Sequence, residues 1–291
     1  FLATDGVQGG PLPRHLVGFG NGNGTFALQA TLLPRVADWG GRNMAVADFD
    51  RDGYLDLAIF TKALYGNAAE VGIYLNNGAA GRGFTAAPVL DIGPVSGTTI
   101  PGAGIAAADF NRDGLLDIVV HSGVTNDPFE GSSNDRLLLF TGRGDGTFNA
   151  ASVVGTGLPE VDEFAAGDLN GDGRMDLVGI GGSVWVLMGN GDGTFAEQVA
   201  YGAGGNPVAL QLIDMNGDRV LDIAAGATNG AFSVLRGNGN GTFQDAQLFA
   251  IGMVGALTVS VGDLNGDGLQ DVVVGHPSTN RNSFTVLIQQ P

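Results

Sequence analysis

Short apolar runs alternate with clusters of glycine and aspartate along most of the chain. Five times, a run of small and apolar residues such as MAVADF or FAAGDL precedes an acidic segment, and a second run such as LDIVV or MDLVGI follows it. A third run, for example RLLLF or VWVLM, leads into a glycine-rich turn that closes on Phe. Short runs rich in Val and Ile, bounded by Gly and Asp, predict strands buried on both faces. The acidic segment is therefore expected to be the hairpin loop between the first two strands.

The acidic segments share the pattern Asp-x-Asx-x-Asp-x-x-x-Asp, and their first aspartates lie 61, 59, 46 and 49 residues apart. Self-similarity at such a period indicates a repeat protein rather than a multidomain enzyme. The segments are 48–56, 109–117, 168–176, 214–222 and 263–271. The glycine turns are GNGNGTF at 20–26 and 237–243, GRGDGTF at 142–148, GNGDGTF at 189–195 and the looser NNGAAGRGF at 76–84. The Phe is expected to open a fourth, more polar strand, so each period predicts one four-stranded antiparallel blade of a β-propeller.

The composition is that of a globular protein and excludes several functional classes. The 291 residues are 44% hydrophobic, which is enough for a large core, and the 51 glycines without a G-X-Y period indicate many tight turns. The absence of Cys excludes disulfides and thiolate metal sites. A formal net charge of -17 argues against nucleic acid as a partner. No apolar run approaches 18 residues and the chain begins at Phe1, so we expect a protein without a membrane span that is a processed product or a fragment.

The acidic segments and the glycine turns together resemble the FG-GAP and VCBS repeats. The resemblance is carried by D-[FL]-N-x-D-G-x-x-D, by the LDxxV-like strand after it and by G-N-G-[DN]-G-T-F, and it covers nearly the whole chain. This family occurs in integrin α-subunit heads, in fungal and bacterial propeller lectins and in many secreted bacterial proteins. The resemblance implies an all-β fold, a β-propeller of four-stranded antiparallel blades with calcium in the loop between the first two strands. It also implies an extracellular or cell-surface location.

The resemblance further implies which atoms would hold calcium. Calcium takes six to eight hard oxygen ligands at roughly 2.3–2.6 Å, and alternating side chains on a tight loop can supply them. In the family pattern, positions 1, 3, 5 and 9 give side-chain oxygens and position 7 gives a backbone carbonyl. The implied side-chain ligands are Asp48, Asp50, Asp52, Asp56, Asp109, Asn111, Asp113, Asp117, Asp168, Asn170, Asp172, Asp176, Asp214, Asn216, Asp218, Asp222, Asp263, Asn265, Asp267 and Asp271. The implied carbonyl donors are Tyr54, Leu115, Arg174, Val220 and Leu269, and about five Ca²⁺ ions per chain are expected.

Other interpretations of the acidic segments are weaker. An EF-hand loop needs Glu at position 12, where this chain has Ile59, Val120, Gly179, Ala225 and Val274. Plain Asp/Gly turns would leave close carboxylates that repel one another. Five divalent cations would change the formal charge from -17 to -7, because 16 of the 30 acidic residues lie in these segments. The fourth segment is expected to bind least tightly, since Arg219 replaces the glycine at position 6.

The sequence offers few residues suited to catalysis. Its only histidines are His15, His121 and His276, and it contains no G-x-S-x-G, H-E-x-x-H or P-loop motif. Metal sites saturated by their own loops leave little room for a substrate, so we expect the ions to hold each hairpin closed. We therefore expect a binding module without catalysis. Two alternatives stay open, namely an enzyme that cleaves polysaccharide with carboxylates on loops, and a structural or filament-forming subunit.

The loops of an antiparallel blade alternate between the two ends of its strands. The acidic loops and the glycine turns share one end, and the connections from strand 2 to 3 and from strand 4 to the next blade share the other. This second end has nearly all the variation in loop length, at 35–43, 61–70, 91–104, 121–136 and 277–283. Binding residues concentrate on variable loops of a rigid scaffold, so this face is expected to recognise carbohydrate or protein. The candidate ligand-binding residues are Trp39, Arg42, Tyr65, His121, Phe129, Arg136 and His276, whereas Trp185 is expected in the core.

The terminal segments decide the number of blades. We expect one domain over 1–291, with a partial blade at 1–34 and repeats at 35–90, 91–154, 155–201, 202–249 and 250–291. The partial blade has the spacing of strands 2, 3 and 4, and the last repeat reaches its third strand in FTVLIQQP. The N-terminal fourth strand could complete the last blade, stand in a partial sixth blade, or pair with another copy to give a homo-oligomer. The spacing favours six blades, while five or seven stay open.

Overall fold

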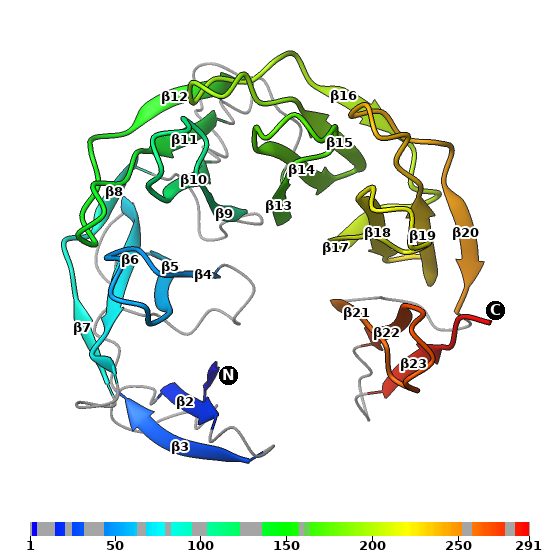
Figure 1. Ribbon diagram of the computed structural model, residues 1–291, viewed down its shortest axis with the longest axis horizontal. Helices are drawn as coiled ribbons and strands as arrows, with labels where there is room; N and C mark the ends of the chain where they lie inside the picture. Colours follow the sequence, from blue (N-terminus) through cyan, green and yellow to red (C-terminus); the bar gives the residue numbers. More distant parts are fainter. Residues whose placement is uncertain are drawn as a thin grey trace.

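The fold is a ring of antiparallel sheets, seen in a computed structural model (Figure 1). The structure describes residues 2–4, 15–20, 25–31, 44–62, 68–78, 83–94, 104–122, 136–156, 161, 163–251, 258–276 and 283–290. Within this part of the chain the strands form six sheets, which we number 1 to 6 in chain order. The predicted all-β propeller with a partial N-terminal blade is confirmed.

The strands of each sheet follow one another in the sequence. Sheet 1 contains β1 (Leu2–Thr4), β2 (His15–Gly20) and β3 (Phe26–Thr31). Sheet 2 contains β4 (Met44–Ala47), β5 (Asp56–Lys62), β6 (Ala68–Asn76), β7 (Phe84–Ala86) and β8 (Leu90–Pro94), which pairs with β6 beside β7. Sheet 3 contains β9 (Ile105–Ala108), β10 (Asp117–Ser122), β11 (Arg136–Phe140) and β12 (Ser152–Thr156).

The remaining sheets repeat this order. Sheet 4 contains β13 (Glu163–Gly167), β14 (Asp176–Gly181), β15 (Ser183–Leu187) and β16 (Val199–Tyr201). Sheet 5 contains β17 (Pro207–Ile213), β18 (Asp222–Ala227), β19 (Ala231–Leu235) and β20 (Gln247–Ala250). Sheet 6 contains β21 (Thr258–Gly262), β22 (Asp271–His276) and β23 (Ser283–Leu287).

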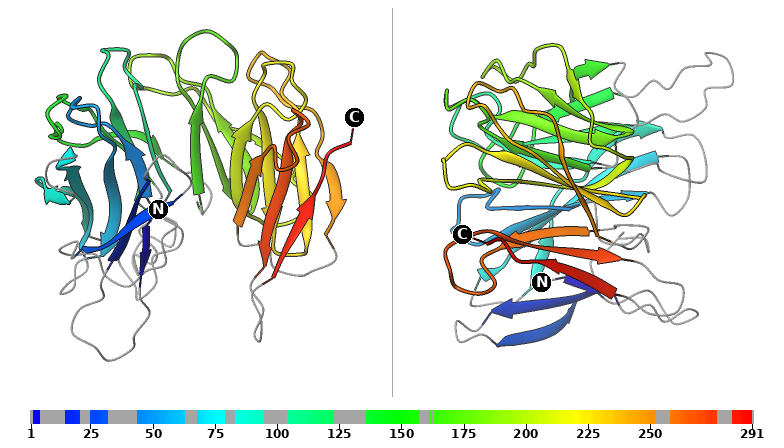
Figure 2. Two further views of the ribbon diagram at one scale, coloured as in Figure 1. Left: turned by 60° about the horizontal axis from the view of Figure 1, so that its bottom comes forward. Right: turned by 90° about the vertical axis from the view of Figure 1, so that its right-hand side faces the viewer.

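The first strand of each of sheets 2 to 6 lies nearest the centre of the ring. These inner strands contact one another in the order β4, β9, β13, β17 and β21, and Figure 1 shows the fourth strands at the periphery. Figure 2 shows the sheets side by side, with their strands running between two rims of the ring. Every acidic segment joins an inner strand to the second strand of its sheet, as the sequence predicted.

The core consists of apolar layers between neighbouring sheets. Alternate residues of a third strand face opposite neighbours, because successive side chains of a strand point to opposite faces. Val184 and Val186 of β15 belong to one buried cluster with Ile223 of sheet 5, whereas Trp185 belongs to another with Val119 of sheet 3. Trp185 is fully buried, so its predicted place in the core is confirmed.

In sheets 3, 4 and 5 the fourth strand begins later than the sequence predicted, whereas Phe26 opens β3 and Phe84 opens β7 as predicted. Phe195 pairs with Gly189 in an isolated bridge that closes the glycine turn, and β16 begins only at Val199. The bridges of Phe148 and Phe243 have the same form. The Phe therefore ends the turn, and three residues separate it from the outer strand of sheet 4.

Candidate metal loops

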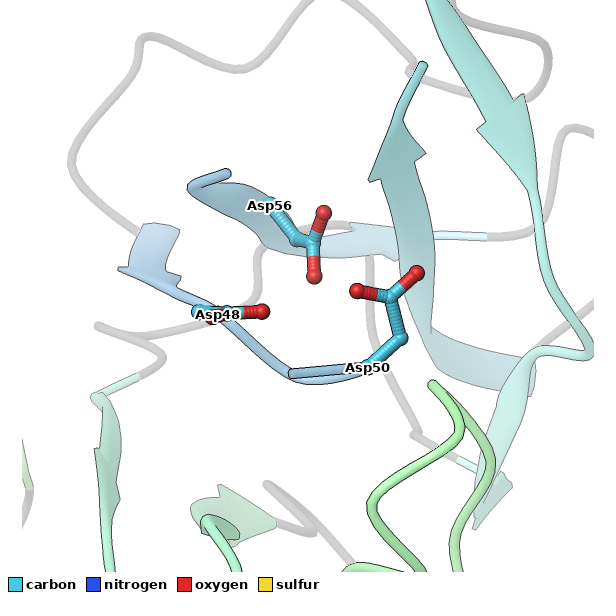
Figure 3. A group of neighbouring side chains, drawn as sticks. All are labelled: Asp48, Asp50 and Asp56. Atoms are coloured by element: carbon cyan, nitrogen blue, oxygen red, sulfur yellow. The ribbon is translucent and has the colours of Figure 1, made fainter. Parts of the chain in front are cut away.

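The five acidic segments form loops on one rim of the ring. In the first loop, oxygen atoms of Asp48, Asp50 and Asp56 lie within 4.8 Å of one another. Figure 3 shows the three carboxylates turned toward a common space. Hard oxygen donors that converge in this way are the donor set that calcium takes in proteins. The residues of the first loop therefore fit a calcium ion.

The aspartate at position 1 shapes the backbone of each loop. In the first loop, Oδ1 of Asp48 accepts the N–H of Asp52 at 3.1 Å, and Oδ2 accepts the N–H of Gly53 at 3.0 Å. The corresponding two bonds recur at Asp109, Asp168, Asp214 and Asp263. A carboxylate oxygen has two lone pairs, so each of these groups orders the loop and still has acceptor capacity for a cation.

Position 6 of the loops requires a left-handed backbone conformation. Four loops have glycine there, with φ of 89°, 84°, 78° and 85° at Gly53, Gly114, Gly173 and Gly268. In the fourth loop Arg219 adopts a φ of 69°, a region that costs a residue with a side chain roughly 1–2 kcal/mol. Arg51 and Arg112 have a φ of 61° at position 4, which the sequence-based interpretation did not notice. The signal was present, because the other three loops have glycine at position 4.

The aspartate at position 9 is fully buried in all five loops and links the acidic loop to the turn after the third strand. Asp117 accepts the N–H of Phe110 at 3.0 Å and the N–H of Gly142 at 2.9 Å. Equivalent pairs of bonds recur at Asp56, Asp176, Asp222 and Asp271. The sequence-based interpretation gave these residues only a metal-binding role, and the link to the turn is an addition from the structure.

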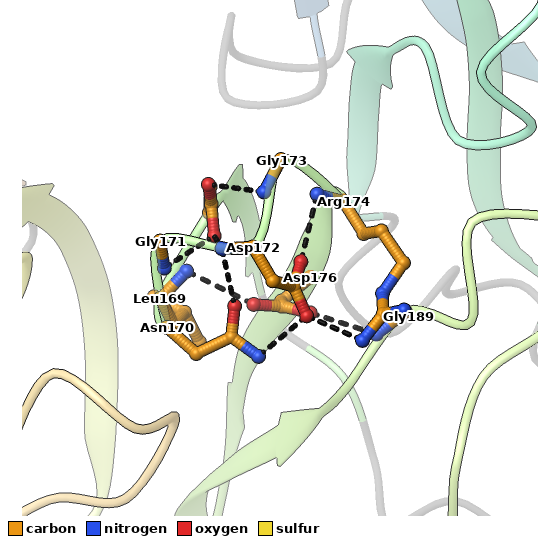
Figure 4. A network of polar contacts seen from close by, with 9 residues as sticks. Leu169, Asn170, Gly171, Asp172, Gly173, Arg174, Asp176 and Gly189 are labelled. Carbon is orange, nitrogen blue, oxygen red and sulfur yellow. Dashed lines mark hydrogen bonds and ion pairs between the residues drawn. The ribbon is translucent and has the colours of Figure 1, made fainter.

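The side-chain contacts at positions 3 and 5 differ between the first loop and the other four loops. Figure 4 shows the third loop, where Nδ2 of Asn170 donates to Asp172 at 2.8 Å and the Asn170 amide oxygen accepts the N–H of Asp172 at 3.0 Å. The same side-chain bond recurs at Asn111, Asn216 and Asn265. Among the described residues, only the first loop brings three acidic side chains together. In the other four loops the asparagine oxygen accepts the position-5 N–H, as Asp50 does in the first loop, while its Nδ2 group faces the position-5 carboxylate.

The position-7 residues donate their N–H groups to the position-5 carboxylate, for example Leu115 to Asp113 at 2.8 Å. Their role as carbonyl ligands stays a prediction. The side chain of Arg174 has an unexpected contact, because its guanidinium forms an ion pair with Asp172. Although desolvation opposes the shift, the hydrogen bonds from the Arg174 N–H, from Asn170 and from the guanidinium lower the pKa of Asp172. Arg174 therefore competes with a cation for an expected ligand of the third loop.

In the first four loops, burial and neighbouring charges both raise the pKa of the aspartate at position 9. Burial raises the pKa of Asp56, Asp117, Asp176 and Asp222, and the two backbone N–H groups that each accepts lower it in part. The other carboxylates of the same loop also raise the pKa by repulsion. A divalent cation in the loop would offset the repulsion between these carboxylates.

Four of the expected ligand-binding residues lie outside the described residues, namely Trp39, Arg42, Tyr65 and Phe129. The sequence placed His121 after the second strand of its repeat, but β10 continues to Ser122 and pairs with β11. His121 is only 2% exposed and its ring lies edge-on to that of Phe164, so its expected place on an exposed loop was wrong. Arg136 is half-buried at the start of β11, and His276 is the last residue of β22.

The sequence itself matches a known repeat family in the region of these loops. Residues 129–179, 168–225 and 214–274 match the FG-GAP-like repeat, and together they cover half of the chain. The chain belongs to the FG-GAP-like repeat family. The matched region contains the third, fourth and fifth acidic loops, and the same loop pattern continues in the first and second repeats.

Solved structures are similar to this chain in fold. The comparison with curated proteins gave no match. A lectin of Agrocybe aegerita that specifically recognises non-reducing terminal N-acetylglucosamine is similar with a TM-score of 0.60 and 23% identity, over 94% of this chain and 74% of the lectin chain. BBS1N in complex with ARL6DN is similar with a TM-score of 0.52 and 14% identity, over 94% of this chain and 75% of the other. At these identities the similarity shows a common propeller fold.

Proposed function

We propose that this FG-GAP protein is a calcium-stabilised binding module that works outside the cell or on its surface and has no catalytic activity. The observation that carries the proposal is the convergence of Asp48, Asp50 and Asp56 in a loop whose pattern recurs four more times. When bound, calcium would supply a fixed positive charge that holds the carboxylates of one hairpin together. The side chains of each loop would orient the ion, and Asp56 and its equivalents would link the ion to the turn after the third strand.

The ligand class is carbohydrate or protein, bound on the rim opposite the acidic loops. The acidic loops are short and are held by repeated backbone bonds, so they vary little between sheets. The variable connections at the other rim are better suited to specific recognition. The Agrocybe lectin, which shares the fold, recognises a sugar, and this supports carbohydrate as the first class to test. Within the described residues, no helix is long and apolar enough to cross a membrane.

Calcium loading tests the metal part of the proposal. Native mass spectrometry of the protein in calcium should find about five ions per chain, given five acidic loops. A chelator should remove the ions and lower the melting temperature by roughly ten degrees or more, since several sites would each lose their binding free energy. Magnesium at the same concentration is the control and should restore little stability, because it demands octahedral order. If neither the mass nor the melting temperature changes on addition of calcium or of chelator, the proposal is refuted.

A glycan array tests the binding part. The calcium-loaded protein should bind specific glycans on the array, and chelation should abolish this binding. If the calcium-loaded protein binds no glycan, it should next be tested against protein ligands. An increase in reducing ends during incubation with an acidic polysaccharide would instead support the polysaccharide-cleaving alternative.

A further inference from the structure

Two arginine side chains from neighbouring acidic loops meet on the glycine turn of sheet 4. A Cβ atom placed on Gly191 would lie 2.7 Å from Cδ of Arg174 and 2.9 Å from Cδ of Arg112. Arg112 is position 4 of the second loop, and Arg174 is position 7 of the third loop. The absence of a side chain at Gly191 therefore leaves room for both stems, and the two guanidinium groups extend from one small area of the acidic-loop rim.

Arg112 has an unfavourable backbone conformation. Its φ of 61° lies in the left-handed region that disfavours a residue with a side chain, and the third, fourth and fifth loops have glycine at this position. The side chain is exposed and forms no hydrogen bond or ion pair with the described residues. Since strained residues concentrate at binding sites, the conformation favours a role for Arg112 in binding a ligand.

Arg174 already has a partner in the structure. Its guanidinium forms an ion pair with Asp172, and Figure 4 shows the side chain curved back toward the third loop to reach this carboxylate. The side chain of Arg174 is 41% exposed, so its position on the rim is accessible to a ligand. Because Asp172 is an expected calcium ligand, a cation in the third loop would take this carboxylate and release the guanidinium of Arg174.

The acidic residue of the same glycine turn has partners of its own. Oδ1 of Asp192 accepts the hydroxyl of Thr194 at 2.6 Å and the N–H of Thr194 at 3.0 Å. These two bonds lower the pKa of Asp192. The carboxylate of Asp192 is thus held by its own turn, and once calcium occupies the third loop both arginines are available to an anion.

We propose that Arg112 and Arg174 form a carboxylate-binding site on the acidic-loop rim, in addition to recognition on the opposite rim, and that calcium in the third loop opens this site. The planar guanidinium groups can each donate paired hydrogen bonds to a carboxylate. A formal net charge of -17 favours a ligand with one isolated anionic group over a polyanion. The calcium step and the ligand class, a sugar that carries a carboxylate, rest on the proposed function.

Methyl glucuronide is the probe, and methyl glucoside, which lacks the carboxylate, is its matched control. Saturation-transfer NMR with the full calcium-loaded chain should show saturable binding of the glucuronide, and the glucoside should bind roughly tenfold more weakly or not at all. Chelation should weaken glucuronide binding several-fold, because Arg174 returns to Asp172. Equal affinity for the two sugars in calcium, or no binding of either, would overturn the proposal.

Native mass spectrometry of the same samples separates this inference from the proposed function. If calcium ions are bound and the glucuronide affinity is the same with and without them, this inference is wrong while the metal part of the proposed function stands. If no ions are bound, the metal part of the proposed function is wrong and the calcium step fails with it. If calcium tightens the glucuronide, the glucuronide must tighten calcium by the same factor, because coupling between two sites is reciprocal.

A pair of matched variants locates the site. Arg112→Ala should weaken glucuronide binding roughly tenfold. Arg51→Ala is the control, because Arg51 has the same φ of 61° and lies on Gly144 in the same way, but its neighbour there is Leu115 instead of a second arginine. It should leave glucuronide binding unchanged. Equal losses of affinity in the two variants would indicate a diffuse positive field and would refute the assignment.

Two further variants separate the ligand from the metal. Arg174→Leu should weaken glucuronide binding and at the same time tighten calcium, since Asp172 loses its ion-pair partner. Leu115→Arg places a second arginine beside Arg51 on Gly144 and should add a second glucuronide per chain. A second bound glucuronide would support the assignment, whereas unchanged glucuronide binding by Arg174→Leu would contradict it.

Discussion

The backbone N–H of Gly189 donates a 2.8 Å hydrogen bond to Oδ1 of Asp176, thirteen residues earlier in the chain. The other oxygen of Asp176 accepts the N–H of Leu169 at 2.9 Å. One buried carboxylate thus fastens the acidic loop to the glycine turn, which explains why the two motifs occur together in the repeat. This link consists of hydrogen bonds within the protein.

Replacing Asp176 should therefore destabilise the protein even in a chelator. Asp176→Ala leaves two backbone N–H groups without acceptors, and each unsatisfied buried group costs roughly 1–3 kcal/mol. We expect the free energy of unfolding to fall by about 3 kcal/mol in chelator and by more in calcium, measured by denaturant unfolding. Asp192→Ala, in the exposed part of the turn, is the control and should change stability little. A loss confined to calcium-containing buffer would mean that Asp176 acts only as a metal ligand.

The repeats made much of this architecture predictable from sequence. The strand order, the position of the acidic loops and the burial of Trp185 follow from apolar runs and spacing, which are local properties. The role of Asp176 in joining two motifs could not be found in this way, because it depends on which backbone groups meet after folding. The burial of His121 was missed for a related reason, since the end of a strand depends on its pairing partner.

Packing between Gly179 and Trp185 gives a prediction about the core. A methyl group added at Gly179 would overlap the Trp185 ring, which is fully buried and has little room to move. Gly179→Ala should lower the free energy of unfolding by about 3 kcal/mol, the upper part of the usual range for overpacking. Gly202→Ala is the control, because nothing lies within 4 Å of the added atom there. Equal melting temperatures for the two variants would contradict this packing.

The ion pair between Arg174 and Asp172 predicts that the proposed calcium site of the third loop is weakened. Arg174→Leu introduces the residue that the second and fifth loops have at this position. Because the pair is partly exposed, it is worth no more than about 1 kcal/mol. Removing it should tighten the site roughly two- to fivefold. The calcium-induced rise in melting temperature should be larger than in wild type, whereas Arg143→Leu, outside the acidic loops, should leave it unchanged.

Arg219 should weaken the fourth site through its backbone as well as its charge. Arg219→Gly removes the cost of a side chain at a φ of 69° and should raise the free energy of unfolding by roughly 1 kcal/mol in chelator. In calcium the increase in the free energy of unfolding should be larger, since the substitution also removes a positive charge from the loop. The reverse change Gly173→Arg in the third loop should have the opposite effect. If Arg219→Gly does not raise the free energy of unfolding in chelator, the backbone strain at this position is not significant.

The proposed recognition rim can be tested through its aromatic residues, which were identified from sequence alone. Aromatic side chains on variable loops are suited to contribute strongly to binding. Alanine at Trp39, Tyr65 or Phe129 should weaken capture of an array-identified ligand at least tenfold, while the melting temperature stays within a few degrees of wild type. Leu264→Ala is a control on the opposite rim, because Leu264 is 55% exposed in the fifth acidic loop and should not affect capture. If Leu264→Ala weakens capture and the three aromatic variants do not, recognition takes place on the rim of the acidic loops.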